Sequence, residues 1–264
     1  MLKMKNGVRV MLDNAYAGEF ANCIPEIPMR FEREGVMLYD KRNVIKSFCL
    51  KADENRTMEV VVKRYKRLFL FQRLIYTFFR KSKAQRAFVN AGELRRRGFD
   101  TPREVACLEE FRGGLLQFGY YVTCRTSDSA IRECLVDRPE FDRGIAEAFA
   151  AFVAQLHEHG ILHHDLNPTN ILYRHNADGT VHFSLIDINR MTFYPDGKSV
   201  DVHTCFDNLT RFTGRMDLYE YVLRSYIDYR GWNKNLLEQA INIKQHHDRA
   251  WRRRKDLLGI LKRL

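Results

Sequence analysis

Hydrophobic and polar positions divide the chain into two halves with different periodicity. In the first half, alternating or β-branched apolar residues predict strands at 35–39, 44–50, 58–65, 105–108 and 115–124. One helical pattern covers 82–97 and stops at Gly98, because glycine favours a helix C-terminus. The pair Gly113–Gly114 predicts the turn between the last two strands.

The second half is mostly helical. Apolar residues at helical spacing predict a helix over 141–159 that ends at Gly160. Two short strands at 171–173 and 182–186 follow, then an irregular stretch to about residue 204, then helices from Phe206 to the end. This order predicts an α+β chain with a small β-rich lobe at 1–128 and a mostly helical lobe at 129–264.

Charge adds a constraint on partners. The chain has 264 residues with a formal net charge of +11, and its hydrophobic content of 45% is enough for a sizeable core. A basic balance of this size indicates a polyanionic partner, such as an anionic membrane face, a phosphorylated substrate or nucleic acid. A solvated basic surface without a specific partner is the alternative. No basic motif interleaved with aromatic residues is present, so nucleic acid is not expected.

Cysteine usage and apolar runs bear on localisation. The six cysteines form no Cys-x-x-Cys pair, which argues against a zinc knuckle or a thioredoxin-type site. Residues 1–16 contain no apolar core of signal-peptide type, so we expect free thiols in the cytoplasm. No run reaches the roughly 18 apolar residues that a membrane-spanning helix needs.

Two segments combine apolar residues with flanking cations and are candidates for contact with the cytoplasmic face of the inner membrane. One is 68–79, with the sequence LFLFQRLIYTFF; the alternative is a helix buried between the lobes. The other is the basic tail 245–264, which predicts an amphipathic helix; the alternative is a helix docked on the larger lobe with a solvated charged face.

Residues 163–170 read His-His-Asp-Leu-Asn-Pro-Thr-Asn, between a predicted helix and a predicted hairpin. Phosphoryl transfer from ATP needs a carboxylate to deprotonate the acceptor hydroxyl, oxygen ligands for Mg²⁺ and a cation on the phosphates. Asp165 suits the first task. Asn170 and Asp187, which ends the next apolar run, suit the second. Lys63 ends a buried strand and suits the third; the alternative is a plain charged strand end.

These residues resemble the motifs of the protein-kinase-like superfamily. The resemblance implies a bilobal protein-kinase-like fold with ATP and Mg²⁺ as cofactors. It implies that Asp165 is the catalytic carboxylate, that Asn170 and Asp187 bind the metal and that Lys63 anchors the phosphates. His164 stands where protein kinases usually have Arg, and no Ala-Pro-Glu follows, so a eukaryotic-type protein kinase is disfavoured.

A closer resemblance is to the lipopolysaccharide core kinase family, which phosphorylates Kdo, an acidic sugar, or heptose. It covers roughly residues 25–215. The segments RKSKAQR at 80–86 and GFDTP at 98–102 are its most discriminating parts, because the catalytic loop is shared across the superfamily. YDKRNVIK at 39–46, VKRYK at 62–66 and DINR at 187–190 add to it. The pattern looks most like a Kdo kinase of the Bacteroides type.

This resemblance implies a kinase that phosphorylates a Kdo hydroxyl of the lipid A–core, and therefore a lipid-linked anionic sugar as its partner. A heptose kinase and another small-molecule or protein kinase remain alternatives, as does a pseudokinase scaffold. The net charge of +11 disfavours kinases of cationic small molecules. The four residues Lys63, Asp165, Asn170 and Asp187 are all present, which disfavours an inactive scaffold.

The loop that covers the phosphates departs from the kinase pattern. Kinases use glycine there, because only glycine lets backbone amides approach the phosphates so closely. The corresponding loop at 39–44 has no glycine. We predict that Arg42 and Lys46 replace some of these amide contacts with cations; two solvent-facing charges on a hairpin are the alternative.

A second departure from the kinase pattern concerns the carboxylate partner of the strand lysine. Kinases orient this lysine with a helical glutamate. Glu93 is the only acidic residue between Glu59 and Asp100, so it is the predicted partner of Lys63. Because Glu93 lies near the end of its helix, a surface pair with Arg97 at i+4 is the alternative.

Overall fold

The computed structural model describes residues 2–5, 7–52 and 56–261. The chain divides into two compact units. The first contains residues 1–127 together with 187–189, and the second contains 128–186 and 190–264. The segment 187–189 was expected in the second lobe, but its contacts place it with the first unit.

The first unit is built on a seven-stranded sheet in the order β1-β2-β6-β7-β5-β4-β3. All its neighbouring strands are antiparallel. The strands are β1 (Leu2–Lys5), β2 (Val8–Leu12), β3 (Val36–Asp40), β4 (Val44–Lys51), β5 (Thr57–Arg64), β6 (Glu104–Arg112) and β7 (Leu115–Cys124). The five strands predicted in this half are confirmed. The hairpin β1–β2 was not predicted.

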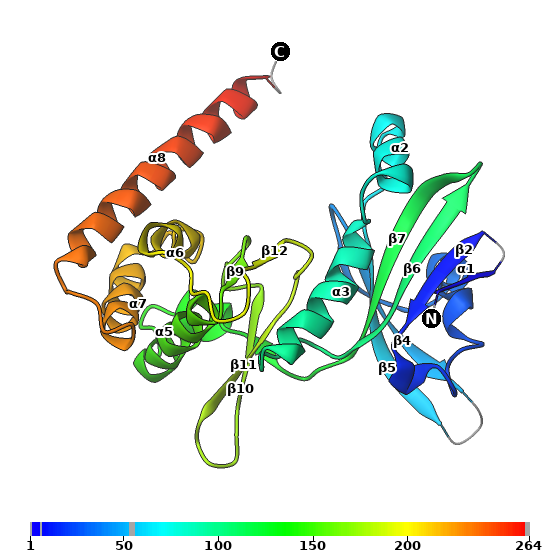
Figure 1. The fold of residues 1–264 in the computed structure, drawn as a ribbon, viewed down its shortest axis with the longest axis horizontal. Helices are drawn as coiled ribbons and strands as arrows, with labels where there is room; N and C mark the ends of the chain where they lie inside the picture. The colour runs from blue at the N-terminus through cyan, green and yellow to red at the C-terminus, as the bar shows by residue number, and fades with distance from the viewer. Residues whose placement is uncertain (1, 6, 53–55, 262–264) are drawn as a thin grey trace. The chain divides into compact units, whose positions relative to one another are not determined.

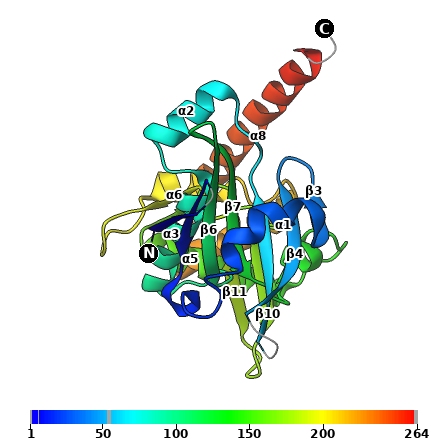
Figure 2. The same ribbon diagram turned by 90° about the vertical axis from the view of Figure 1, so that its right-hand side faces the viewer.

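Helices cover both faces of this sheet. The 3-10 turns η1 (Asn14–Tyr16) and η2 (Ile24–Glu26) lead into α1 (Ile27–Arg33), while α3 (Lys83–Arg96) packs on β6 and β7. Figure 2 shows α1 in front of the strands and α3 behind them. The approach of α3 is close, because a Cβ added to Gly119 of β7 would lie 3.2 Å from the Cβ of Ala84.

Alternation along β5 decides which way Lys63 points. Val60 and Val62 are fully buried in the core that contains Phe31 of α1. Because side chains in a strand alternate between faces, Lys63 points to the opposite face, where α3 lies. The residue predicted to anchor phosphate is therefore held on the α3 face of the sheet.

Helix α2 (Leu70–Phe78) contains no buried residue. The side chains of Phe71, Phe78 and Phe79 are 73%, 66% and 82% exposed. Arg73 donates a hydrogen bond to the carbonyl of Leu116, at 2.9 Å, and so attaches the helix to β7 (Figure 1). Within the first unit, the apolar surface of α2 is therefore not covered, and the alternative of a helix buried between the lobes stays a prediction.

The second unit combines helices with two small sheets. The helices are α4 (Arg132–Leu135), α5 (Arg143–Glu158), α6 (Val202–Leu209), α7 (Met216–Tyr229) and α8 (Leu236–Leu261). The strands are β8 (Ser129–Ala130), β9 (Ile161–His163), β10 (Ile171–His175), β11 (Val181–Leu185) and β12 (Met191–Phe193). The hairpin β10–β11 confirms the prediction, whereas β12, paired with β9, lies in the stretch expected to be irregular.

Aromatic packing and one buried cation hold this unit together. Phe149 of α5 stacks on Phe212, with ring centroids 4.6 Å apart. Lys244 of α8 is 2% exposed and donates to the carbonyl of Thr210 at 2.8 Å. The first half of α8 is therefore docked on the unit, whereas both alternatives for the tail 245–264 stay predictions. The side chains of 257–264 lie outside the described residues.

Two further expectations concern thiols and membrane spans. All six cysteines are free. Within the described residues, no helix combines the length and the apolar character that crossing a membrane requires.

Candidate active site

Lys63 and Asp187 meet in the first unit. The Lys63 Nζ lies 2.7 Å from the Asp187 Oδ1. Asp187 has φ of 55°, the only positive φ at a non-glycine residue in the described chain. Aspartate tolerates this left-handed conformation better than most residues do. The next residue is fixed too, because Asn90 of α3 donates from its Nδ2 to the carbonyl of Ile188 at 2.7 Å.

Two buried polar atoms near this ion pair have no hydrogen-bond partner: the Tyr65 hydroxyl and the Arg86 Nε. The Lys63 Nζ lies 5.3 Å from the centre of the Tyr65 ring. Burial, followed by the negative charge of Asp187, raises the pKa of Tyr65 well above its usual value, and the charge of Arg86 lowers it in part. Buried donors without partners suit an anionic ligand, so this region fits the phosphates of ATP.

Glu93 is engaged elsewhere. Its carboxylate pairs with the guanidinium groups of Arg96 and Arg97, at 2.7 Å each. The hydrogen bond from Arg96 is the main reason that the pKa of Glu93 falls to about 2. The predicted pair with Lys63 is not formed, and the alternative pair with Arg97 is the one present. The physical reason is position, because Glu93 faces the last turn of its own helix.

The two loop cations behave differently. The Lys46 Nζ donates to the carbonyls of Phe31 and Glu34, at 2.6 and 3.0 Å. It therefore satisfies backbone groups at the C-terminal end of α1, which a helix leaves without partners. A role for Lys46 toward phosphate is not supported. Arg42 is exposed in the turn between β3 and β4, and its role stays a prediction.

The second unit brings Asp165 and Asn170 together. The Asn170 Nδ2 donates to the backbone carbonyl of Asp165 at 2.9 Å. The Asn167 Nδ2 donates to the Asp165 Oδ1 at 3.0 Å and so orients the carboxylate. Asn167 was missed in the sequence. Its position two residues after an aspartate in a loop, where amide side chains often bond to nearby groups, was the available indication.

His163 fixes the start of this loop. Its ring is 1% exposed, with Nδ1 3.1 Å from the backbone N–H of Asp165 and Nε2 2.9 Å from the carbonyl of Ile186. The ring accepts at Nδ1 and donates at Nε2, which makes it the neutral Nε2–H tautomer. In return, the N–H of Ile186 donates to the carbonyl of Asn170 at 2.9 Å. Asp187 directly follows Ile186 in the chain. This bond therefore joins one predicted metal ligand, Asn170, to the residue that precedes the other, Asp187.

A buried polar network supports the loop from behind. The His157 ring bonds to the Tyr226 hydroxyl at 2.8 Å and to the Asn208 Oδ1 at 3.1 Å. The Asn208 Nδ2 then donates to the carbonyl of His163 at 2.9 Å. Burial lowers the pKa of His157 to about 4, so the ring is neutral at physiological pH.

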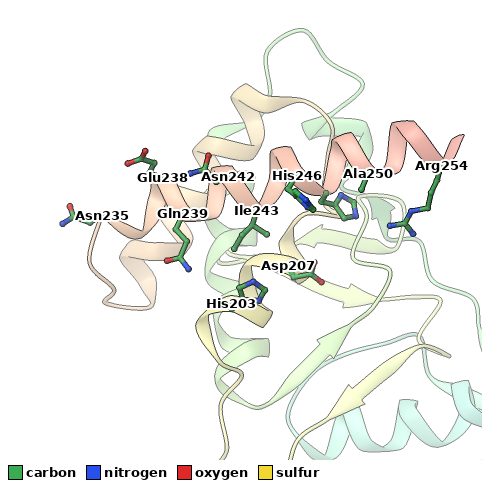
Figure 3. Close-up of a pocket in the computed structure, with 11 residues that line it drawn as sticks. His203, Asp207, Asn235, Glu238, Gln239, Asn242, Ile243, His246, Ala250 and Arg254 are labelled. Atoms are coloured by element: carbon green, nitrogen blue, oxygen red, sulfur yellow. The ribbon is translucent and has the colours of Figure 1, made fainter. Parts of the chain in front are cut away.

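Two pockets lie on the second unit. One, of about 770 Å³, is lined by Asp165 and Asn167 of the loop and by residues of α8. The other, of about 880 Å³, is the groove drawn in Figure 3, with His203 and Asp207 of α6 facing His246 of α8. None of the predicted site residues lines this groove. In the described part of the chain, no group of at least three His, Cys, Asp or Glu residues could hold a metal ion.

Comparisons with known proteins identify a family and a fold. The model of the lipopolysaccharide kinase (Kdo/WaaP) family matches residues 49–203. No curated protein matches the chain in sequence. Among solved structures, "WaaP in complex with acyl carrier protein" has a TM-score of 0.56 at 15% identity, covering 94% of this chain and 97% of that one.

A Rio2 kinase–ADP/Mg²⁺–phosphoaspartate complex from Chaetomium thermophilum has a TM-score of 0.43 at 17% identity, covering 92% of this chain and 82% of that one. The likeness to WaaP shows the fold, which confirms the predicted protein-kinase-like architecture. The Bacteroides-type likeness stays a prediction. Because the family model matches more than half of the chain, this phosphotransferase belongs to the lipopolysaccharide kinase (Kdo/WaaP) family.

Proposed function

We propose that the protein transfers the γ-phosphoryl group of ATP to a sugar hydroxyl of a lipid-linked anionic acceptor, with Kdo on lipid A as the favoured acceptor. The observation that carries the proposal is the 2.7 Å contact between Lys63 and Asp187. It places an ammonium beside a carboxylate on the α3 face of the sheet. Phosphoryl transfer uses this pair of charges to hold a triphosphate and its metal.

Each residue has one task in this proposal. Lys63 binds the α- and β-phosphates, while Asp187 and the Asn170 Oδ1 provide oxygen ligands for Mg²⁺. Mg²⁺-ATP supplies the phosphoryl group when bound, and the metal screens its charge. Arg42 and the buried Arg86 Nε are further cations for the phosphates.

Asp165 orients the acceptor hydroxyl and takes its proton. The Asp165 Oδ1 accepts the hydrogen bond from Asn167, at 3.0 Å, and the residue lines the pocket of about 770 Å³. The bond to one oxygen limits rotation of the carboxylate, so the other oxygen is held ready for the acceptor. A base in this position acts on the acceptor and not on the nucleotide.

The identity of the acceptor rests on the family and on charge. The matching family includes Kdo kinases by its name. Kdo carries a carboxylate and lipid A carries phosphates, so a chain with a net charge of +11 attracts such an acceptor. A heptose of the core is the second candidate acceptor.

The test is incubation of the protein with ATP, Mg²⁺ and Kdo–lipid A, followed by mass spectrometry of the lipid. A heptose-containing core acceptor without Kdo forms the parallel reaction, and Asp165→Asn is the inactive control. We expect one added phosphate on the Kdo acceptor. Phosphate only on the heptose acceptor would show that heptose, and not Kdo, is the acceptor sugar. Phosphate on neither acceptor would refute the proposal.

We also propose that the enzyme works in the cytoplasm, peripherally bound to the cytoplasmic face of the inner membrane through α2. Six large apolar side chains in and beside this helix are 41–82% exposed: Phe69, Leu70, Phe71, Leu74, Phe78 and Phe79. Every charged residue between positions 60 and 92 is Lys or Arg. Apolar side chains surrounded only by cations suit insertion at the surface of an anionic bilayer.

Sedimentation with anionic liposomes tests this attachment. The double variant Phe71→Ser/Phe78→Ser should lose most of its lipid-bound fraction. The double variant Arg253→Gln/Arg254→Gln measures how much the C-terminal helix contributes to lipid binding. Equal sedimentation of the α2 variant and the wild type would contradict the proposal. Because the similar WaaP structure contains acyl carrier protein, binding of that protein by the same variants tests the competing occupant of α2.

A further inference from the structure

The pocket beside Asp165 has four walls, all in the second unit, and Arg132 and Val136 at α4 form one of them. The loop that follows β9, residues 210–214 and α8 form the other three. The volume of about 770 Å³ is within the range of ligand sites. The proposed base is part of the lining, whereas Lys63 and Asp187, the proposed nucleotide-binding pair, are not. A molecule in this pocket is therefore placed to meet the base and not to replace ATP.

One face of α8 is turned toward this pocket. The lining residues of the helix are Lys244, His247, Asp248, Trp251 and Arg252. This spacing of three and four residues places them on one side of an α-helix. The face is fixed in place, because the Lys244 Nζ bonds both to the Thr210 carbonyl and to the Asp248 Oδ1, at 2.8 Å each.

Cations predominate among the charged side chains of the lining. Three of them are already paired with carboxylates: Arg132 with Asp137 at 2.9 Å, Arg211 with Asp207 at 3.3 Å, and Lys244 with Asp248 at 2.8 Å. The fourth, Arg252, is exposed and makes no ion pair or side-chain hydrogen bond within the described chain. Arg252 is thus the lining cation whose guanidinium is available to a ligand.

Trp251 precedes Arg252 in α8 and lines the same pocket. The residue is 55% exposed although it lines the pocket, and its ring is contacted on one side by Lys255, with 5.2 Å between the ammonium and the ring centre. A large exposed aromatic ring and an unpaired guanidinium in one pocket lining combine an apolar plane with an anion receptor. The ring suits the apolar face of a sugar, and the guanidinium suits a carboxylate or phosphate in bidentate geometry.

We infer that this pocket is the acceptor subsite, and that Arg252 binds an anionic group of the acceptor sugar or its lipid headgroup while Trp251 packs against the sugar ring. The inference rests on the proposed phosphotransfer function and adds to it the residues that select an anionic acceptor. It also assigns a task to α8, which forms one wall of the reaction pocket. Arg252 and Trp251 bind the acceptor; Asp165 remains the catalytic residue.

The experiment compares Arg252→Gln and Trp251→Ala with the wild type in steady-state phosphorylation of Kdo–lipid A by the full-length protein. Arg253→Gln is the matched control, because Arg253 is an exposed arginine one position along the same helix and does not line the pocket. We expect Arg252→Gln to raise the KM for the acceptor by roughly ten-fold or more, the usual cost of a charge-assisted contact. The KM for ATP and the circular dichroism spectrum should not change, and the control should behave as the wild type.

Two modified acceptors distinguish the sources of the anionic group. One carries the Kdo carboxyl as its methyl ester, and the other lacks the lipid A phosphates. The form that lacks the bound group should have a raised KM with the wild type and no further increase with Arg252→Gln. If neither modification raises the KM, or if Arg252→Gln matches Arg253→Gln, the inference is overturned while the kinase function stands. If the wild type phosphorylates no acceptor, the proposed function itself fails and the inference falls with it.

Discussion

Replacing the buried His157 by Gln should remove much of the acid sensitivity of the second unit. The ordinary pKa of histidine is 6.5, and burial lowers the pKa of His157 to about 4 in the folded protein. At pH values between these two, the unfolded chain binds a proton at this ring and the folded chain does not. The free energy of unfolding therefore rises with pH in this window. The contribution of His157 to stability is fully present above about pH 6.5 and is lost as the pH falls toward 4.

The size of the effect follows from the same two values. The difference between 6.5 and about 4 corresponds to on the order of 3 kcal/mol. This is a large part of the stability of an ordinary domain. The charge of Arg230 acts in the same direction as burial, and the hydrogen bond with Asn208 acts against it. Because Asn208 also holds the carbonyl of His163, protonation of the His157 ring should disturb the loop that carries Asp165.

The assay is urea unfolding followed by tryptophan fluorescence between pH 4 and pH 7.5. Both tryptophans, Trp232 and Trp251, belong to the second unit, and Trp232 packs on Tyr226, the hydrogen-bond partner of His157. His157→Gln should lower stability at neutral pH but show a flatter pH dependence than the wild type. His175→Gln, which changes an exposed histidine, should keep the wild-type slope. Equal slopes for His157→Gln and the wild type would refute the reasoning.

Three further variants test other parts of the structure. Asp165→Asn should lower kcat by about 10²–10⁴-fold with little change in ATP binding, measured by phosphate transfer and nucleotide titration; wild-type turnover would contradict its role as base. Glu93→Gln should leave kcat near the wild-type value but cost about 1–3 kcal/mol of stability, since Glu93 pairs with the exposed Arg96 and the nearly buried Arg97 and not with Lys63; a large loss of turnover would restore the kinase-type pair. Gly35→Ala should lower the free energy of unfolding by about 1–3 kcal/mol, because φ is +87° and the new Cβ would lie 2.7 Å from the Phe48 ring. Urea unfolding measures this loss, and an unchanged midpoint would contradict it.

Much of the fold could be predicted because its elements have local patterns of residue type and periodicity. The strand at 58–65 has a β-branched apolar run and the helix at 82–97 has a helical pattern that ends at a glycine, and the structure confirms both as β5 and α3. Strands β9 and β12 could not be predicted in this way. Each has three residues, and each is stabilised by a partner that is distant in sequence. A strand of that length is too short to show a pattern of its own.

The candidate site was predictable where backbone connectivity sets the geometry. Asp165 and Asn170 are five residues apart in one loop, so a few turn-forming hydrogen bonds bring them together. The prediction that Glu93 pairs with Lys63 was wrong. The sequence showed an acidic residue on the right helix, but it did not show toward which side of the helix its carboxylate points. Packing of α3 against the sheet through Ala84 turns a different side of the helix, the one with Asn90, toward the 187–189 segment.

The sequence by itself determined the family, the order of the elements and the residue types needed for phosphoryl transfer, since these depend on local pattern and on spacing along the chain. Tertiary structure decided that Lys63 pairs with Asp187, that Lys46 belongs to α1 and that α8 forms a wall of the pocket beside Asp165. The physical reason is that such contacts join residues far apart in the chain, whose distances are set by core packing and buried hydrogen bonds and leave no trace in local periodicity.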